Sequence, residues 1–111
     1  MRQKIIDTRE LEIASQVKTI ARSILSDADV ILYGSRARGD ERADSDWDFL
    51  ILTDEQVTVA LEEKVRRAMD TLSLDLDVVI SAFVENRQYW STPLAKASPY
   101  HQVIEREGIA V

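Results

Sequence analysis

The sequence contains no cysteine and a single histidine, His101. A chain without cysteine forms no disulfide framework, no thiolate zinc site and no thiol nucleophile, and it suits a reducing compartment. Glycine and proline are scarce, at 3 and 2 residues, while 45% of the residues are hydrophobic, which is typical of a folded globular domain. The longest apolar runs span only four residues, too few to cross a membrane. We therefore expect a cytoplasmic domain with no membrane partner.

Basic residues are fewer than acidic ones. The chain has 14 Lys and Arg against 20 Asp and Glu, for a net charge of −6. A protein that tracks nucleic acid needs a cationic face, so we expect no direct tracking of DNA or RNA. The acidic excess is concentrated between residues 40 and 85, which hold 13 acidic and 4 basic side chains. Several of these acids fall inside apolar, strand-like runs, and a merely solvated surface does not account for them.

What the chain does contain is an alternation of helix and strand patterns within 111 residues, the size of one domain. Apolar spacing and capping residues predict helices over 8–25 with Asp7 as N-cap, from a capping box at 53–56 to about 72, near 89–90, and from 98 to 108. Short apolar or alternating runs predict strands over 30–33, 46–52, 74–80 and 109–111. This order predicts an α/β (α+β) domain, a small mixed sheet of three to four strands with helices packed on it.

Two aspartates lie two positions apart in the second predicted strand. Because side chains alternate along a strand, Asp46 and Asp48 leave the same face, about 6.6 Å apart. The next predicted strand carries Asp75 and Asp77, and either can join the pair if the two strands are neighbours. Carboxylates this close repel one another unless a cation lies between them, and their hard oxygens suit Mg²⁺ or Mn²⁺. The pattern is typical of a two-ion site for phosphoryl or nucleotidyl transfer, with solvated strand ends as the alternative.

A second motif stands upstream of this pair. Gly34 and Ser35 follow directly after the first predicted strand, where a helical turn begins. Backbone N–H groups at such a turn form a seat for phosphate. The Ser35 hydroxyl can add a hydrogen bond, and Arg36 and Arg38 can add positive charge. The alternative is an ordinary turn with Ser35 as a helix N-cap.

Gly34-Ser35 and Asp46-x-Asp48, with ten residues between them, together resemble the signature of the polymerase-beta-like nucleotidyltransferase superfamily. The run GSRARGDERADSDWDFLIL is similar to that family's Gly-Ser-x-Ala-x-Gly and Ser-Asp-x-Asp elements. The run Leu76-Asp77-Val78-Val79 looks like the strand that gives the family its third carboxylate. Spacing alone leaves Asp75 and Asp77 open for that role, and the likeness to the family strand favours Asp77. The small size looks most like the minimal nucleotidyltransferases, antitoxins that act beside HEPN-type RNase toxins.

The resemblance implies one minimal nucleotidyltransferase domain over residues 1–111 that transfers AMP from ATP with two Mg²⁺ ions, Mn²⁺ being an alternative. It implies that Asp46, Asp48 and Asp77 are catalytic metal ligands. Gly34, Ser35 and Arg36 would bind the nucleotide. A chain this short leaves no room for a substrate domain, so the acceptor must come from another molecule. The family implies a tyrosine hydroxyl of a HEPN toxin, held in a hetero-oligomer and silenced by AMP. Two alternatives stay open: transfer to a small molecule such as an aminoglycoside, and a non-enzymatic antitoxin that blocks its partner by binding.

Three other side chains receive structural interpretations. Trp47 alternates to the face opposite the two aspartates and is predicted to lie in the core. Tyr33 belongs to a buried strand. His101 is predicted to lie at the surface of the last helix or to cap it.

Overall fold

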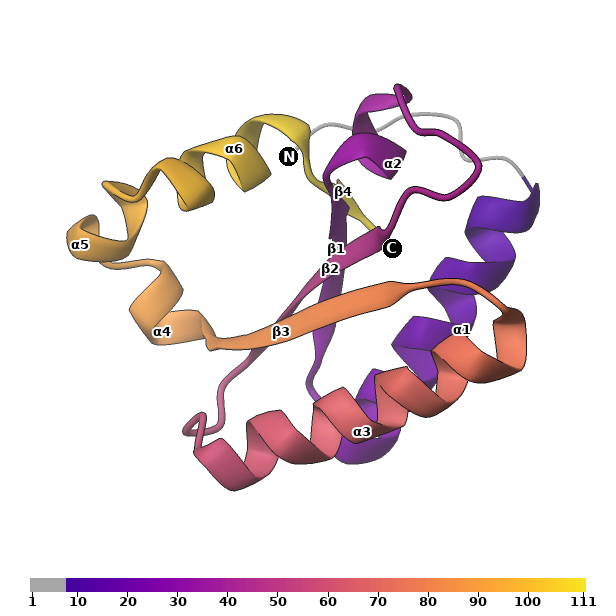
Figure 1. The fold of residues 1–111 in the computed structure, drawn as a ribbon. Helices are drawn as coiled ribbons and strands as arrows, with labels where there is room; N and C mark the ends of the chain where they lie inside the picture. Colours follow the sequence, from indigo (N-terminus) through magenta and orange to yellow (C-terminus); the bar gives the residue numbers. More distant parts are fainter. Residues whose placement is uncertain (1–7) are drawn as a thin grey trace.

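The computed structural model of the chain describes residues 8–111 (Figure 1). Its elements follow in the order α1 (Thr8–Ile24), β1 (Asp29–Tyr33), α2 (Ser35–Arg38), β2 (Trp47–Thr53), α3 (Val59–Leu76), β3 (Ile80–Asn86), α4 (Arg87–Trp90), α5 (Pro93–Lys96), α6 (Pro99–Glu107) and β4 (Ile109–Ala110). The predicted N-cap at Asp7 lies outside the described residues. Among residues 8–111, no helix combines the length and the hydropathy that a membrane span requires. The alternation of helices and strands confirms the predicted fold class.

The four strands form one mixed sheet in the order β3-β2-β1-β4. β1 runs antiparallel to both β2 and β4, whereas β2 and β3 are parallel and are connected through α3. A parallel pair needs such a crossover because the chain must return to the same end of the sheet. The register places Asp48 of β2 between Tyr33 of β1 and Ser81 of β3. Asp48 therefore lies near the start of a central strand, at the end of the sheet where β1 finishes.

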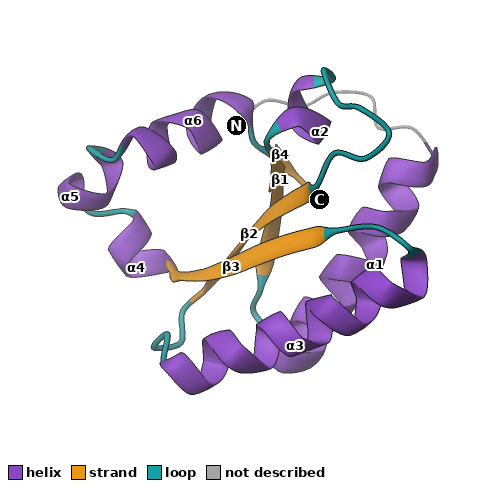
Figure 2. Ribbon diagram, viewed as in Figure 1, coloured by secondary structure: helices purple, strands orange, loops and turns teal. Residues whose placement is uncertain are grey.

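The two faces of the sheet are covered unequally (Figure 2). α1 and α3 cover one face and enclose the larger core, to which Trp47 and Phe49 contribute fully buried side chains. The core position of Trp47 is therefore confirmed. On the other face, α6 packs Ile104 against Ile31 and Leu50. The short helices α4 and α5 lead from β3 to α6 along this second, less covered face, which we call the open face (Figure 1).

The prediction of a third strand over 74–80 is wrong. β3 spans Ile80–Asn86, and residues 74–76 form the last turn of α3. The alternating apolar residues fit both structures, because Leu76 also continues the helical spacing and packs against the core. Leu74, which the strand pattern places beside Leu76, is 83% exposed.

α3 ends at Asp77, which adopts the left-handed conformation with φ 54°. The N–H of Asp77 donates to the carbonyl of Leu74, and the N–H of Val78 donates to the carbonyl of Ser73 at 3.1 Å. This pair of bonds is a Schellman ending, which satisfies the last carbonyls of the helix. Asp77 therefore lies at a helix terminus rather than on a strand.

The start of α3 also differs from the prediction. The capping sequence at 53–56 does not open the helix, which begins after Thr58, whose side chain accepts a hydrogen bond from the N–H of Leu61. Thr53 instead ends β2, is fully buried, and donates its hydroxyl to Asp27 at 2.7 Å. Because Thr53 belongs to β2 and its hydroxyl is bonded to Asp27, it does not act as the N-cap of α3.

The surface position predicted for His101 is wrong as well. His101 is 4% exposed, and its ring stacks on Trp90 with centroids 4.1 Å apart. Its Nε2 lies 3.0 Å from the carbonyl oxygen of Trp90, which gives this buried imidazole a polar partner. His101 thus joins α6 to α4.

Arg87 holds together the end of the sheet that lies away from the two aspartates. Its Nη2 donates to Asp29 at 2.8 Å and to the carbonyl of Asp27 at 3.0 Å, and its Nη1 donates to Asp54 at 2.6 Å. Hydrogen bonds from the Asp54 N–H and the Thr53 hydroxyl, with Arg87 as a further contributor, hold the pKa of Asp27 below its ordinary value. One guanidinium therefore joins the starts of β1 and α4 to the turn after β2.

We expect Arg87→Ala to lower the free energy of unfolding by about 1–3 kcal/mol, because charge-assisted hydrogen bonds are lost from a partly exposed site. Urea unfolding at pH 7 measures the effect. Arg66→Ala is the matched control, since Arg66 pairs with Glu63 and Asp70 on the exposed face of α3, where solvent screens the charges, and its loss should cost clearly less than that of Arg87. Equal losses in the two variants would contradict a bridging role for Arg87.

Candidate active site

Gly34 stands at the end of β1 and opens α2, a single turn closed by hydrogen bonds from the N–H groups of Ala37 and Arg38 to the Gly34 carbonyl. Its φ of +79° is a conformation that side-chain-bearing residues rarely adopt. A Cβ built on Gly34 would lie 2.5 Å from Oδ2 of Asp48. The Asp48 carboxylate therefore packs directly against the Gly34 backbone. The two motifs that the sequence separates are in contact here.

Asp46 and Asp48 form an electrostatically coupled pair. Asp48 is half-buried on β2. Asp46, which directly precedes that strand, is exposed. Burial raises the pKa of Asp48 above its usual value, the charge of Asp46 raises it further, and Arg38 partly offsets both. Two carboxylates in this relation are stabilised by a cation, and their oxygens are the donors that Mg²⁺ and Mn²⁺ prefer.

The structure does not bring Asp75 or Asp77 to this pair. Asp75 is exposed on α3, and Asp77 lines a pocket of about 640 Å³ on the side of the sheet covered by α1 and α3. Within residues 8–111, no three Asp, Glu or His side chains lie close enough to share a metal ion. The role of Asp77 as a third ligand therefore stays a prediction.

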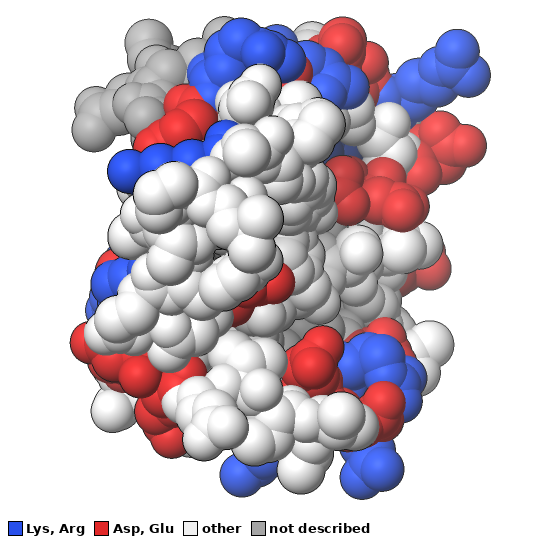
Figure 3. Space-filling model, turned by 90° about the vertical axis from the view of Figure 1, so that its left-hand side faces the viewer, with Lys and Arg blue, Asp and Glu red and all other residues white. Residues whose placement is uncertain are grey.

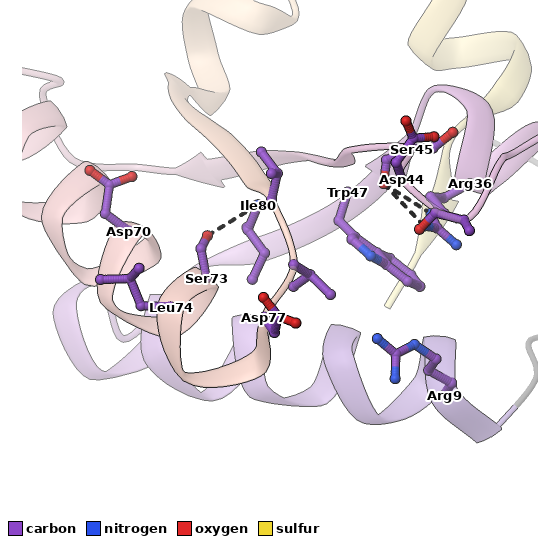
Figure 4. Close-up of a pocket in the computed structure, with 13 residues that line it drawn as sticks. Arg9, Arg36, Asp44, Ser45, Trp47, Asp70, Ser73, Leu74, Asp77 and Ile80 are labelled. Atoms are coloured by element: carbon purple, nitrogen blue, oxygen red, sulfur yellow. Dashed lines mark hydrogen bonds between the residues drawn. The ribbon is translucent and has the colours of Figure 1, made fainter.

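Figure 4 shows that pocket, with Arg36 above the indole of Trp47 and Asp77 on the opposite wall. The Arg36 guanidinium lies 4.3 Å from the Trp47 ring centroid, a cation–π distance. Its Nη2 also donates to the carbonyls of Ser45 at 3.0 Å and Ala43 at 3.3 Å. Arg36 thus braces the loop that leads into Asp46. Its predicted contact with a nucleotide is a separate role, and that role stays a prediction.

A group of aromatic residues beside Asp48 was not anticipated as part of the site. Tyr33, Phe83 and Tyr100 meet on the open face, with the Tyr33 and Tyr100 rings 5.6 Å apart and the Phe83 and Tyr100 rings 4.9 Å apart. The Tyr100 hydroxyl donates to the Tyr33 hydroxyl at 2.9 Å. Tyr33 is only half-buried, so its predicted burial is met in part. If β3 is placed correctly in the sequence, the alternation of side chains along it predicts Phe83 and Glu85 as part of the site, because they share one face with Ser81, the partner of Asp48.

The space-filling view over α4–α6 shows a largely uncharged surface with a hollow, and acidic side chains are visible in and around that hollow (Figure 3). On the open face, burial raises the pKa of Glu85, with the charge of Glu62 as a second cause. Burial also raises the pKa of both Tyr33 and Tyr100, and the charge of Asp48 contributes to each shift. An anionic substrate is repelled by this face unless cations accompany it.

The mixed sheet and the contact between the two motifs define a nucleotidyltransferase fold. A family model described as a nucleotidyltransferase domain matches residues 14–97. A relative from Methanocaldococcus jannaschii, named as a protein adenylyltransferase, is 38% identical over 76 residues, which cover 67% of this chain and 77% of the relative. The chain belongs to the nucleotidyltransferase domain family. The predicted superfamily and enzyme class are thereby confirmed.

Solved structures share this fold. A toxin–antitoxin complex with AMP-PNP has a TM-score of 0.63 at 17% identity, covering 87% of this chain and 70% of that chain. A complex of a tri-AMPylated HEPN toxin from Shewanella oneidensis with its MNT antitoxin has a TM-score of 0.57 at 15% identity, covering 90% and 69%. At this level of identity, the likeness establishes the fold.

Proposed function

We propose that this chain transfers AMP from ATP to a tyrosine hydroxyl of a HEPN-type RNase toxin in the cytoplasm, and that it acts as the antitoxin of a hetero-oligomeric pair. The observation that carries the proposal is the contact between Asp48 and Gly34, which brings the proposed metal ligand against the proposed phosphate seat. The name of the Methanocaldococcus jannaschii relative supports adenylyl transfer. The toxin–antitoxin complexes with the same fold support the partner.

In this proposal, Asp46 and Asp48 hold two Mg²⁺ ions, and Mn²⁺ can replace them. The donor set fits, because a half-buried carboxylate whose pKa is raised by burial and by a neighbouring carboxylate gains stability from a cation. When bound, the ions neutralise charge on the phosphates and favour departure of pyrophosphate. The protein's own contribution is to fix the two carboxylates against the Gly34 turn.

Asp77 is proposed as the third ligand after a local change at the end of α3. It has the same parity as Ser81, so an extension of β3 back over residues 77–79 would turn its carboxylate to the open face. The extension would replace the left-handed conformation of Asp77, which costs about 1 kcal/mol for a residue with a side chain, and would give up the two hydrogen bonds that end α3.

Gly34, Ser35 and Arg36 are proposed to bind the triphosphate. We expect Ser35→Ala to weaken ATP binding in the presence of Mg²⁺ by about 1–3 kcal/mol, the value of a hydrogen bond to a charged group. Isothermal titration calorimetry with and without Mg²⁺ measures this change. Ser23→Ala, which alters an exposed hydroxyl bonded within α1, is the control and should leave the affinity unchanged. Equal affinity of the wild type and Ser35→Ala would contradict the phosphate seat.

The deciding experiment is the intact mass of the cognate HEPN partner after incubation with this protein, ATP and Mg²⁺. We expect the partner to gain the mass of one or more AMP units on a tyrosine. A partner that stays unmodified but inhibited would establish inhibition by binding alone. AMP found only on free small molecules such as aminoglycosides would keep the chemistry and overturn the partner assignment.

A further inference from the structure

The chain carries three tyrosines, and two of them lie beside the proposed metal site. Tyr33 is opposite Asp48 in the β1–β2 register and directly precedes Gly34. Tyr100, in the first turn of α6, donates its hydroxyl to the Tyr33 hydroxyl at 2.9 Å. The third, Tyr89, is 48% exposed on α4. A tyrosine hydroxyl of this chain thus stands next to the place where the triphosphate is proposed to bind.

Tyr100 is held in this position by its neighbours and still meets solvent. Its ring lies 4.9 Å from Phe83 of β3 and 6.2 Å from Trp90 of α4, centroid to centroid. The residue nevertheless keeps 36% of its surface exposed. Tyr100 contacts Phe83 of β3 and the Tyr33 hydroxyl of β1, the two strands that flank the Asp48 strand β2, so it lies over the open face beside Asp48. A nucleotide entering the open face therefore meets Tyr100.

We propose that Tyr100 is an acceptor for AMP within its own chain, so that the protein adenylylates itself when no partner is bound. The inference rests on the proposed function, from which it takes the nucleotide, the metal and the tyrosine chemistry. In the step, the Tyr100 oxygen forms a bond to the α-phosphorus of ATP, and the bond from that phosphorus to the bridging oxygen breaks. Pyrophosphate leaves with the bonding electron pair. The phenol proton passes to the Tyr33 hydroxyl, which releases its own proton to water.

The modification limits itself to one event. AMP on Tyr100 is a phosphodiester with one negative charge, and it would lie near Asp48 and Glu85. The attached nucleotide also fills the space that a second ATP needs. A modified chain therefore neither accepts a second AMP nor transfers AMP to a partner.

The test uses the purified protein alone with ATP and Mg²⁺, followed by intact-mass measurement and peptide mapping. We expect the mass of a single AMP on Tyr100 and a rate constant that is independent of protein concentration, as an intramolecular step requires. Tyr100→Phe keeps the ring and should lose the modification completely. Tyr89→Phe, the control on an exposed tyrosine, should retain it. Circular dichroism confirms that both variants fold.

The proposal is overturned if AMP is found on another residue or if wild-type protein labels an Asp48→Asn chain in trans. It also fails if Tyr100→Phe binds ATP less tightly while the wild type stays unmodified, since Tyr100 then contacts nucleotide only. A parallel reaction with the HEPN partner distinguishes failure of self-modification from failure of the proposed function. A modified partner and an unmodified Tyr100 leave the proposed function standing without self-modification. No modification of either protein defeats both.

Discussion

Asp48→Asn is expected to lower the rate of AMP transfer to the partner by about a thousandfold or more. Asp48 is the carboxylate in contact with the Gly34 turn, so in the proposed function it is the residue that joins metal to nucleotide. Metal ions supply several kcal/mol of charge stabilisation in such reactions, and about 1.4 kcal/mol corresponds to each tenfold in rate. Single-turnover measurement of partner modification at saturating ATP and Mg²⁺ gives the value.

The same variant should be no less stable than the wild type without metal. Burial and the Asp46 charge raise the pKa of Asp48, so the folded chain holds that proton more tightly than the unfolded chain. This contribution to stability is present below the unfolded pKa of the group and is lost as the pH rises through the folded pKa. At pH 7 the ionised carboxylate therefore opposes folding, and asparagine removes that cost.

Thermal unfolding at pH 7, with and without Mg²⁺, checks this second effect. Mg²⁺ should raise the unfolding temperature of the wild type and leave that of Asp48→Asn almost unchanged, because ligands stabilise only the state they bind. Asp44→Asn, in the exposed loop before β2, is the control and should resemble the wild type in both assays. A variant that is inactive because it is unfolded would contradict the account.

The parts of the site that the sequence predicts are those decided by neighbouring residues. Two-residue alternation and a short apolar run are enough to place Asp48 on a strand, and the glycine at the end of β1 marks the turn. The final helix is also predicted from local signals, since Pro99 marks its start and Gly108 its end. The fold class follows from the order of such elements. In these segments, local preference and tertiary structure agree.

The third strand could not be placed because two periodicities fit the same residues. Leu74 and Leu76 alternate with aspartates as in a strand, but Leu76 also lies on the helical face that packs on the core. Packing of α3 over a parallel crossover decides between them, and that contact is not local in sequence. The left-handed ending at Asp77 has no glycine to signal it. Because the sequence pattern places the strand at 74–80, it does not predict Phe83 and Glu85 as part of the site.

Contacts between distant segments were also beyond the sequence pattern. Tyr100 meets Tyr33 across 67 positions, and Arg87 meets Asp27 across 60. No spacing rule connects such residues, since only the completed sheet brings β1, β3 and α6 together. The buried His101 has the same origin, because its partner Trp90 belongs to a separate helix.

The second large effect is expected for Gly34→Ala, which should abolish metal-dependent ATP binding and lower the free energy of unfolding by about 2–4 kcal/mol. Gly34 has φ +79° and ψ −158°, a region essentially restricted to glycine, where a side chain costs of order 1–3 kcal/mol. The new Cβ would also lie 2.5 Å from Asp48 Oδ2, closer than any contact allows. Either the carboxylate moves or the turn opens, and each displaces the proposed metal ligand from the proposed phosphate seat.

Gly39→Ala separates these two causes. Gly39 also has a positive φ, +86°, but a Cβ there meets nothing within 4 Å. It should therefore cost only the backbone strain, about 1 kcal/mol, and leave ATP binding and transfer within a few-fold of the wild type. Calorimetry with Mg²⁺-ATP and urea unfolding of both variants provide the comparison. If Gly34→Ala binds ATP as well as Gly39→Ala does, the contact between Gly34 and Asp48 is incidental to the site, and the observation that carries the proposed function loses its force.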